Sequence, residues 1–157
     1  MQRRNFCWTL VLCGSPSVWA HGSDADHITQ LLKRQFDRPD APLKVEPVVV
    51  LGDVAVAGWF QQARGGRALL RKGKAGWSIQ VCAGKGLTQT DFLIMTGLPK
   101  SQAAQLATQV MKAESALTAA QRAVLDSFEG VVNVKGDHGH AHGHGSHKAS
   151  SVLEHRH

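Results

Sequence analysis

The sequence has little of what most enzyme active sites are built from. Between His27 and His138 there is no histidine, and the whole chain has three cysteines. Ser-His-Asp and Cys-His sites need an imidazole beside the nucleophile, so neither is expected in this stretch. The glycines at 65–66 and 84–86 do not form a phosphate-binding pattern. These absences predict a protein that is not an enzyme.

The chain also lacks a long apolar run and a concentrated basic surface. No segment after residue 20 is apolar enough to cross a bilayer, so we expect no membrane span. The formal net charge is +6, but the basic residues are spread along the sequence. Nucleic-acid binding usually requires them to gather on one surface. We therefore expect no nucleic-acid partner.

Residues 1–20 have the features of a signal peptide. Arg3 and Arg4 precede a short apolar run, and Val18 and Ala20 occupy the −3 and −1 positions of a signal-peptidase site. We expect cleavage after Ala20 and export to a bacterial periplasm. The loss of Arg3 and Arg4 would lower the formal net charge from +6 to +4.

Cys82 would be the one cysteine left after this cleavage, because Cys7 and Cys13 lie in the signal peptide. A single cysteine cannot form an internal disulfide. We interpret Cys82 either as a small buried hydrophobic residue or, if it is exposed, as a soft ligand for Cu(I).

Residues 21–134 are predicted to form one α+β domain. Apolar residues at helical spacing from Ile28 to Phe36 indicate an N-terminal helix. Valine-rich and alternating runs, separated by glycine-bearing turns, then indicate a four-stranded antiparallel meander. Pro47 predicts that the first strand is an edge or bulged strand. The expected strands are 43–51, 53–61, 66–72 and 76–82.

Two details of this sheet follow from the residue pattern. Trp77, Ile79 and Val81 alternate with Ser78, Gln80 and Cys82, which predicts that the first three share one face. The stretch ARGGRA, which contains both glycines at 65–66, is predicted to form the turn between the second and third strands.

Helices are predicted to follow the sheet and to cover one of its faces. Thr88 and Asp91 form a possible cap for a short helix, and Pro99 begins an alanine-rich helix. Thr118 and Gln121 have the spacing of a capping box for the last helix. The apolar face of the alanine-rich helix is expected to comprise Ala103, Leu106, Val110 and Met111.

The most unusual stretch is DHGHAHGHGSH at 137–147. Alternate residues of an extended chain point the same way, and the glycines between them let the backbone fold around an ion. Imidazole binds copper, zinc and nickel, and a flexible ligand set follows the order of intrinsic affinity, which places Cu(II) above Zn(II). We predict that 135–157 is a disordered metal-binding tail, with copper preferred and zinc as the alternative. The expected ligands are His138, His140, His142, His144 and His147.

The predicted N-terminus offers a second metal site. Cleavage after Ala20 would make His21 the first residue, so its amino group and imidazole could chelate one ion together. This pair is half of a copper histidine brace, and His27 or a tail histidine would have to complete it. The alternatives are that His21 only marks the cleavage point and that His27 is an exposed helix residue.

Two other interpretations of the tail stay open. A histidine-rich tract can be a solvated low-complexity segment without a metal. It can also respond to pH, because histidine titrates near neutrality. The second property would accompany metal binding rather than replace it.

The middle of the chain resembles a known family. The runs FDRPDAPLKVEPVVVLGDVAVAGWFQQARGGRALLRK, GWSIQVCAGKGL and SFEGVV, within 26–132, resemble small exported proteins described as copper uptake system-associated proteins. This resemblance implies a periplasmic protein that works beside an outer-membrane copper receptor and periplasmic copper chaperones. It also implies a short histidine-bearing C-terminus, which is longer in this chain.

Together these features predict a periplasmic copper-binding accessory protein that captures, buffers or hands over copper for an uptake system. The alternatives are a zinc- or nickel-buffering protein, a histidine-brace copper enzyme, and a domain that binds a small ligand or another protein.

Overall fold

The computed structural model describes residues 24–134. Its order of one helix, an antiparallel sheet and further helices confirms the predicted α+β class. None of the helices in this part of the chain is both long and apolar enough to cross a membrane. In chain order the elements are α1 (Asp24–Phe36), β1 (Leu43–Leu51), β2 (Val54–Gln61), β3 (Arg64–Gly73), β4 (Gly76–Ala83), η1 (Lys85–Thr88), α2 (Thr90–Met95), α3 (Lys100–Glu114), α4 (Ala119–Asp126) and β5 (Val131–Asn133).

The sheet has five antiparallel strands in the order β1-β2-β3-β4-β5. The first four form the predicted meander, with ends that differ from the expected ones by at most two residues. The fifth strand was not predicted. It pairs Val132 with Cys82 of β4, and the Val134 N–H then donates to the carbonyl of Gln80 at 2.8 Å. The chain therefore returns to the sheet after α4.

The prediction for Pro47 is confirmed. β1 is an edge strand, and its pairing with β2 shifts register between Val45 and Val48. The irregularity contains Pro47, which has no N–H to donate to a neighbouring strand.

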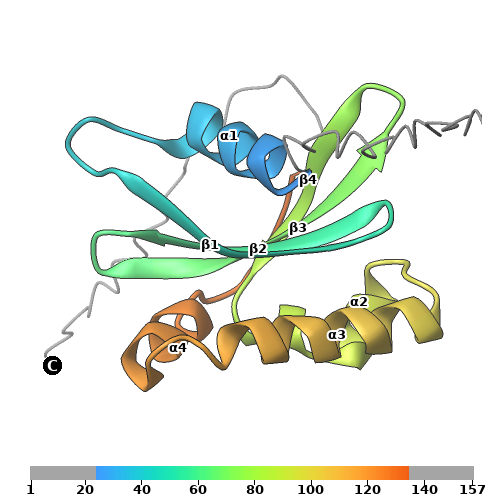
Figure 1. Ribbon diagram of the computed structural model, residues 1–157. Helices are drawn as coiled ribbons and strands as arrows, with labels where there is room; N and C mark the ends of the chain where they lie inside the picture. The colour runs from blue at the N-terminus through green and yellow to red at the C-terminus, as the bar shows by residue number, and fades with distance from the viewer. Residues whose placement is uncertain (1–23, 135–157) are drawn as a thin grey trace, which may run out of the picture.

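Helices cover both faces of the sheet. Figure 1 shows α1 on one face and α2, α3 and α4 on the other. The C-terminal helices therefore share one face, as predicted. On their side, β2 to β4 contribute Val54, Val56, Leu69, Val81 and Ala83 to the core. On the α1 side, the same strands contribute Ala55, Ala57, Ala68, Leu70, Ile79 and Cys82.

The predicted facing of β4 is wrong at one end. The pairing with β3 passes from Val81 directly to Ile79, so Gln80 is an extra residue in the strand. This bulge reverses the alternation. Trp77 and Ile79 pack on the α1 side together with Cys82, whereas Val81 packs on the side of α3.

The glycine pair that was predicted to form a turn lies in β3 instead. A Cβ on Gly65 would come 2.7 Å from Cγ1 of Val124 in α4. A Cβ on Gly66 would come 2.9 Å from Cζ2 of Trp59 and 3.0 Å from Cβ of Phe128. These glycines let α4 and the segment after it pack directly on the strand backbone.

One predicted cap is present and the other is absent. Gln121 N–H donates to Oγ1 of Thr118 at 3.2 Å, and the Thr118 N–H donates to Oε1 of Gln121 at 2.9 Å, which confirms the capping box. The cap expected at Thr88 is wrong, because Gln89 is the N-cap of α2. Thr88 belongs to η1, and its hydroxyl donates to the carbonyl of Lys85 at 2.8 Å.

The apolar face of α3 is narrower than predicted. Ala103, Leu106 and Val110 are buried, but the Met111 side chain is 54% exposed. Glu114 is buried in its place one turn later, at the end of the helix, where it meets Arg67 of β3.

Candidate functional site

Most of the predicted metal ligands lie outside the described residues. These are His21, His138, His140, His142, His144 and His147, and the predicted disorder of 135–157 lies there too. His27 is on α1, with an exposed side chain. Within 24–134, no group of three or more histidine, cysteine, aspartate or glutamate side chains is placed to hold a metal ion. The metal sites therefore stay predictions.

The neighbourhood of His27 has a structural role. His27 lines a shallow pocket that also includes Asp24, Lys72 and Trp77. Oδ1 of Asp24 accepts hydrogen bonds from Lys72 Nζ at 2.7 Å and from Trp77 Nε1 at 2.9 Å. These bonds lower the pKa of Asp24. They join the start of α1 to the β3–β4 hairpin.

Cys82 is a buried thiol, 9% exposed. Burial raises its pKa to about 11, so it is protonated at neutral pH. A copper ligand is a thiolate, and reactive cysteines usually have a lowered pKa and some exposure. Exposure was the condition for Cu(I) binding, and Cys82 does not meet it. The structure instead supports its interpretation as a small hydrophobic residue.

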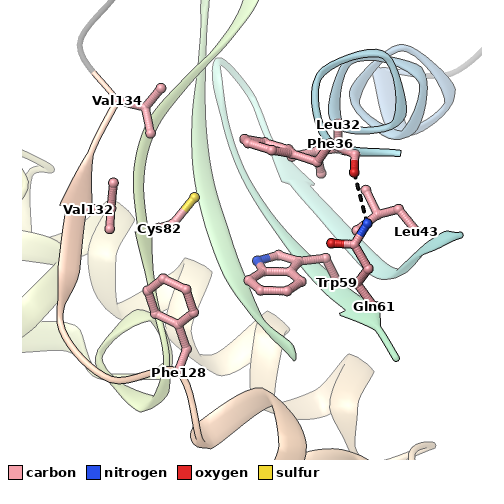
Figure 2. A pocket seen from close by; sticks show the side chains of 9 residues that line it. All are labelled: Leu32, Phe36, Leu43, Trp59, Gln61, Cys82, Phe128, Val132 and Val134. Carbon is pink, nitrogen blue, oxygen red and sulfur yellow. Dashed lines mark hydrogen bonds between the residues drawn. The ribbon is translucent and has the colours of Figure 1, made fainter. Parts of the chain in front are cut away.

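An apolar cavity of about 220 Å³ lies beside the second half of α1. Figure 2 shows nine side chains around it, with the sulfur of Cys82 pointing inward from β4. Leu32 and Phe36 of α1 line one side, and Trp59 of β2 and Phe128 after α4 line another. The remaining lining residues are Leu43, Gln61, Val132 and Val134.

Small residues lie in the sheet next to this cavity. Ala57, Ala68 and Cys82 are paired across β2, β3 and β4 and belong to the core on the α1 side. The next pair along β2 and β3 is Trp59 with Gly66. The Trp59 ring meets Phe128 edge to face, with centroids 5.7 Å apart. Of the small side chains, Cys82 lines the cavity itself, beside the rings of Trp59 and Phe128.

The opposite face of the sheet holds a buried charge cluster, whose residues border an open pocket with a mainly polar and charged lining. Nε and Nη2 of Arg67 donate to the two carboxylate oxygens of Glu114 at 2.6 and 2.7 Å. Nη1 lies 2.9 Å from Oδ1 of Asp126 and donates to the carbonyl of Leu125 at 3.2 Å. Burial opposes the charge on Arg67, but these partners outweigh it and raise its pKa. The arginine joins β3, α3 and α4.

Sequence reasoning missed both features. Arg67 was grouped with the dispersed basic residues of the chain, although it is in phase with the inward-facing Leu69 of the same strand. The signal for the charge cluster was an arginine at a strand position where an apolar residue is expected. The signal for the cavity was the presence of alanine and glycine in neighbouring strands, at positions where larger residues usually fill a core.

Comparison with known proteins does not add to this description. A scan of protein-family models and searches of curated proteins and of solved structures found no match to the chain. The functional argument therefore depends on its own residues.

Proposed function

We propose that this chain is an exported, non-enzymatic copper-binding accessory protein of the periplasm, which captures, buffers or hands over copper for an uptake system. One observation carries the proposal: five histidines lie between His138 and His147, directly after the end of an α+β domain. The signal-peptide pattern at 1–20 and the resemblance to copper uptake system-associated proteins support the same compartment and cargo.

The chemistry of the segment favours copper. Five imidazoles separated by small residues can rearrange to meet the geometry an ion prefers, so such a segment imposes little geometry of its own. Intrinsic affinity then decides, and it ranks Cu(II) above both Zn(II) and Ni(II). Selectivity against zinc would follow from this ranking rather than from a rigid cavity.

The described domain offers separate donors that do not converge. The exposed His27 and the buried, protonated Cys82 lie on different elements, α1 and β4. Oδ1 of Asp24 already binds Lys72 and Trp77. This arrangement supports a division in which the histidine-rich segment binds copper and the domain presents it to a partner.

A competition titration tests the proposal. The chain from His21 to His157 is titrated with Cu(II), Cu(I) and Zn(II) against chromophoric chelators, beside a version that ends at Val134. A matched variant keeps the full length but carries asparagine at 138, 140, 142, 144 and 147. A further variant has one glycine added before His21, which moves the amino group away from that imidazole.

The proposal predicts tight, copper-selective binding that is lost in both the truncated and the asparagine forms. If copper still binds to the truncated and asparagine forms but not to the form with the added glycine, the site is at His21. The predicted role of the tail is then wrong. If the full chain does not prefer copper to zinc, the copper assignment fails and a zinc- or nickel-buffering function replaces it.

A further inference from the structure

The cavity beside α1 contains an indole N–H without a protein acceptor. Among the described residues, Nε1 of Trp77 donates to Asp24 at 2.9 Å, but Nε1 of Trp59 forms no such bond. No buried side-chain nitrogen or oxygen in 24–134 lacks a partner, so Nε1 of Trp59 is accessible to solvent. Figure 2 shows it directed toward the cavity, on the side of Cys82. An accessible indole N–H can donate to a molecule bound beside it.

Gln61 supplies a second polar group at the same cavity. Its Nε2 donates to the carbonyl of Phe36 at 2.9 Å and to that of Ala41 at 2.7 Å. These two bonds fix the orientation of the amide and leave Oε1 to accept a hydrogen bond. In Figure 2, Oε1 faces the side of Trp59.

The other lining side chains are apolar or, like the Cys82 thiol, uncharged. A charged ligand would lose its hydration here without gaining an ionic partner from the lining, which is unfavourable. A cavity of about 150 Å³ with aliphatic walls is enough to bind benzene. A cavity of about 220 Å³ has room for an aromatic ring with a small substituent.

We propose that the cavity between α1, the sheet and Phe128 is a binding site for a small, neutral, mainly apolar molecule that carries one carbonyl or hydroxyl oxygen. The indole N–H of Trp59 donates to that oxygen, and the rings of Trp59, Phe36 and Phe128 enclose the apolar part. Small-molecule sites commonly combine apolar walls with a few placed polar groups in this way. The site is distinct from the proposed copper ligands.

Three isosteric probes test the inference. Acetophenone carries a carbonyl oxygen, α-methylstyrene has a CH₂ group in its place, and benzoate has a charged carboxylate. Each is added to the ¹⁵N-labelled chain from His21 to His157. The ¹H–¹⁵N indole signal of Trp59 reports binding, together with the backbone amide signals of Cys82 and Val132, which remain in a Trp59 variant. The Trp77 indole signal is the internal control.

Acetophenone is expected to bind and to shift the Trp59 indole signal, while the Trp77 signal stays in place. In Trp59→Phe, which keeps a ring against Phe128, the preference for acetophenone over α-methylstyrene should fall about three- to tenfold, the value of one net hydrogen bond. Cys82→Met should fill part of the cavity and abolish binding of both acetophenone and α-methylstyrene. A dispersed spectrum confirms that each variant is folded.

Three results would overturn the proposal. The first is no binding of either neutral probe to the full chain. The second is benzoate binding as tightly as acetophenone. The third is binding that occurs only after the chain is shortened to Val134, because residues 135–157 would then be the occupant.

Discussion

The two faces of the sheet differ in the size of their side chains, although both are buried. Toward α3, the central strands present Val54, Val56 and Leu69, which are buried against the helices of that side. Toward α1, they present Ala57 and Ala68, and a cavity remains. The same three strands thus contribute larger side chains at the centre of one face, here called the closed face, and smaller ones beside the apolar cavity on the other, here called the hollow face. Burial alone therefore does not show whether a residue lies on the closed face or on the hollow face.

The faces also differ in charge. The closed face contains Arg67 with two carboxylate partners, Glu114 and Asp126. The lining of the cavity contains no charged side chain. We infer that the closed face stabilises the domain and that the hollow face is available for binding.

The largest expected effect comes from breaking the closed face at Glu114. Glu114→Ala leaves Arg67 with only the partly exposed Asp126 as an ionic partner, and the loss of a buried partner costs about 3–5 kcal/mol in unfolding free energy. The control is Glu46→Ala, because the Glu46–Lys44 pair is exposed and should contribute less than about 1 kcal/mol. Urea denaturation measures both, and equal losses would contradict the account.

Adding the same side chain on each face sharpens the comparison directly. Val56→Met should lower the unfolding free energy by about 1–3 kcal/mol, because Val56 is buried in the tightly packed core of the closed face. Cys82→Met should cost less than about 1 kcal/mol, because its side chain extends into the cavity. A larger loss for Cys82→Met than for Val56→Met would show that the cavity has no room for the longer side chain.

The hollow face should also give the domain a dependence on alkaline pH. Burial raises the pKa of the Cys82 thiol from its ordinary value of 9.0 to about 11 in the fold. Below pH 9, both the folded and the unfolded chain keep the proton, and Cys82 adds no pH dependence. Between pH 9 and about pH 11, the Cys82 thiol loses its proton in the unfolded chain but keeps it in the folded chain, so the free energy of unfolding falls as pH rises. The total loss is roughly 3 kcal/mol, measured by urea denaturation, and Cys82→Ala should lack it.

The smallest expected effect concerns the aromatic wall of the cavity. Gly66→Ala places a Cβ 2.9 Å from the Trp59 ring and 3.0 Å from Phe128, which should destabilise the fold by about 1 kcal/mol and disturb the Trp59 indole signal. Gly73→Ala, in the same strand, has no atom within 4 Å of the new Cβ. It should leave both the stability and that signal unchanged. Equal effects of the two substitutions would mean that the absence of a side chain at Gly66 does not determine how Trp59 and Phe128 pack beside the cavity.

Local pattern predicted the elements of this fold but not the cavity. Alternation and turn residues indicated four strands, and Thr118 with Gln121 indicated a helix start, because these depend on neighbours in sequence. The bulge at Gln80 and the strand β5 depend on partners far along the chain. The cavity requires side chains from α1, three strands of the sheet and the chain after α4 to meet, which no single segment reveals. The candidate copper ligands, by contrast, were predicted from sequence alone, and except for His27 they lie outside the described residues.

A Cu(II) titration of the ¹⁵N-labelled chain from His21 to His157 tests the central division most directly. Paramagnetic Cu(II) broadens the signals of nuclei close to it. In this chain the Trp77 indole reports on the start of α1 and the Trp59 indole reports on the cavity. We predict that the first equivalent broadens the amide signals of 138–147 and leaves the Trp59 indole signal sharp. Broadening of the Trp59 signal, with those of 138–147 unchanged, would contradict the account.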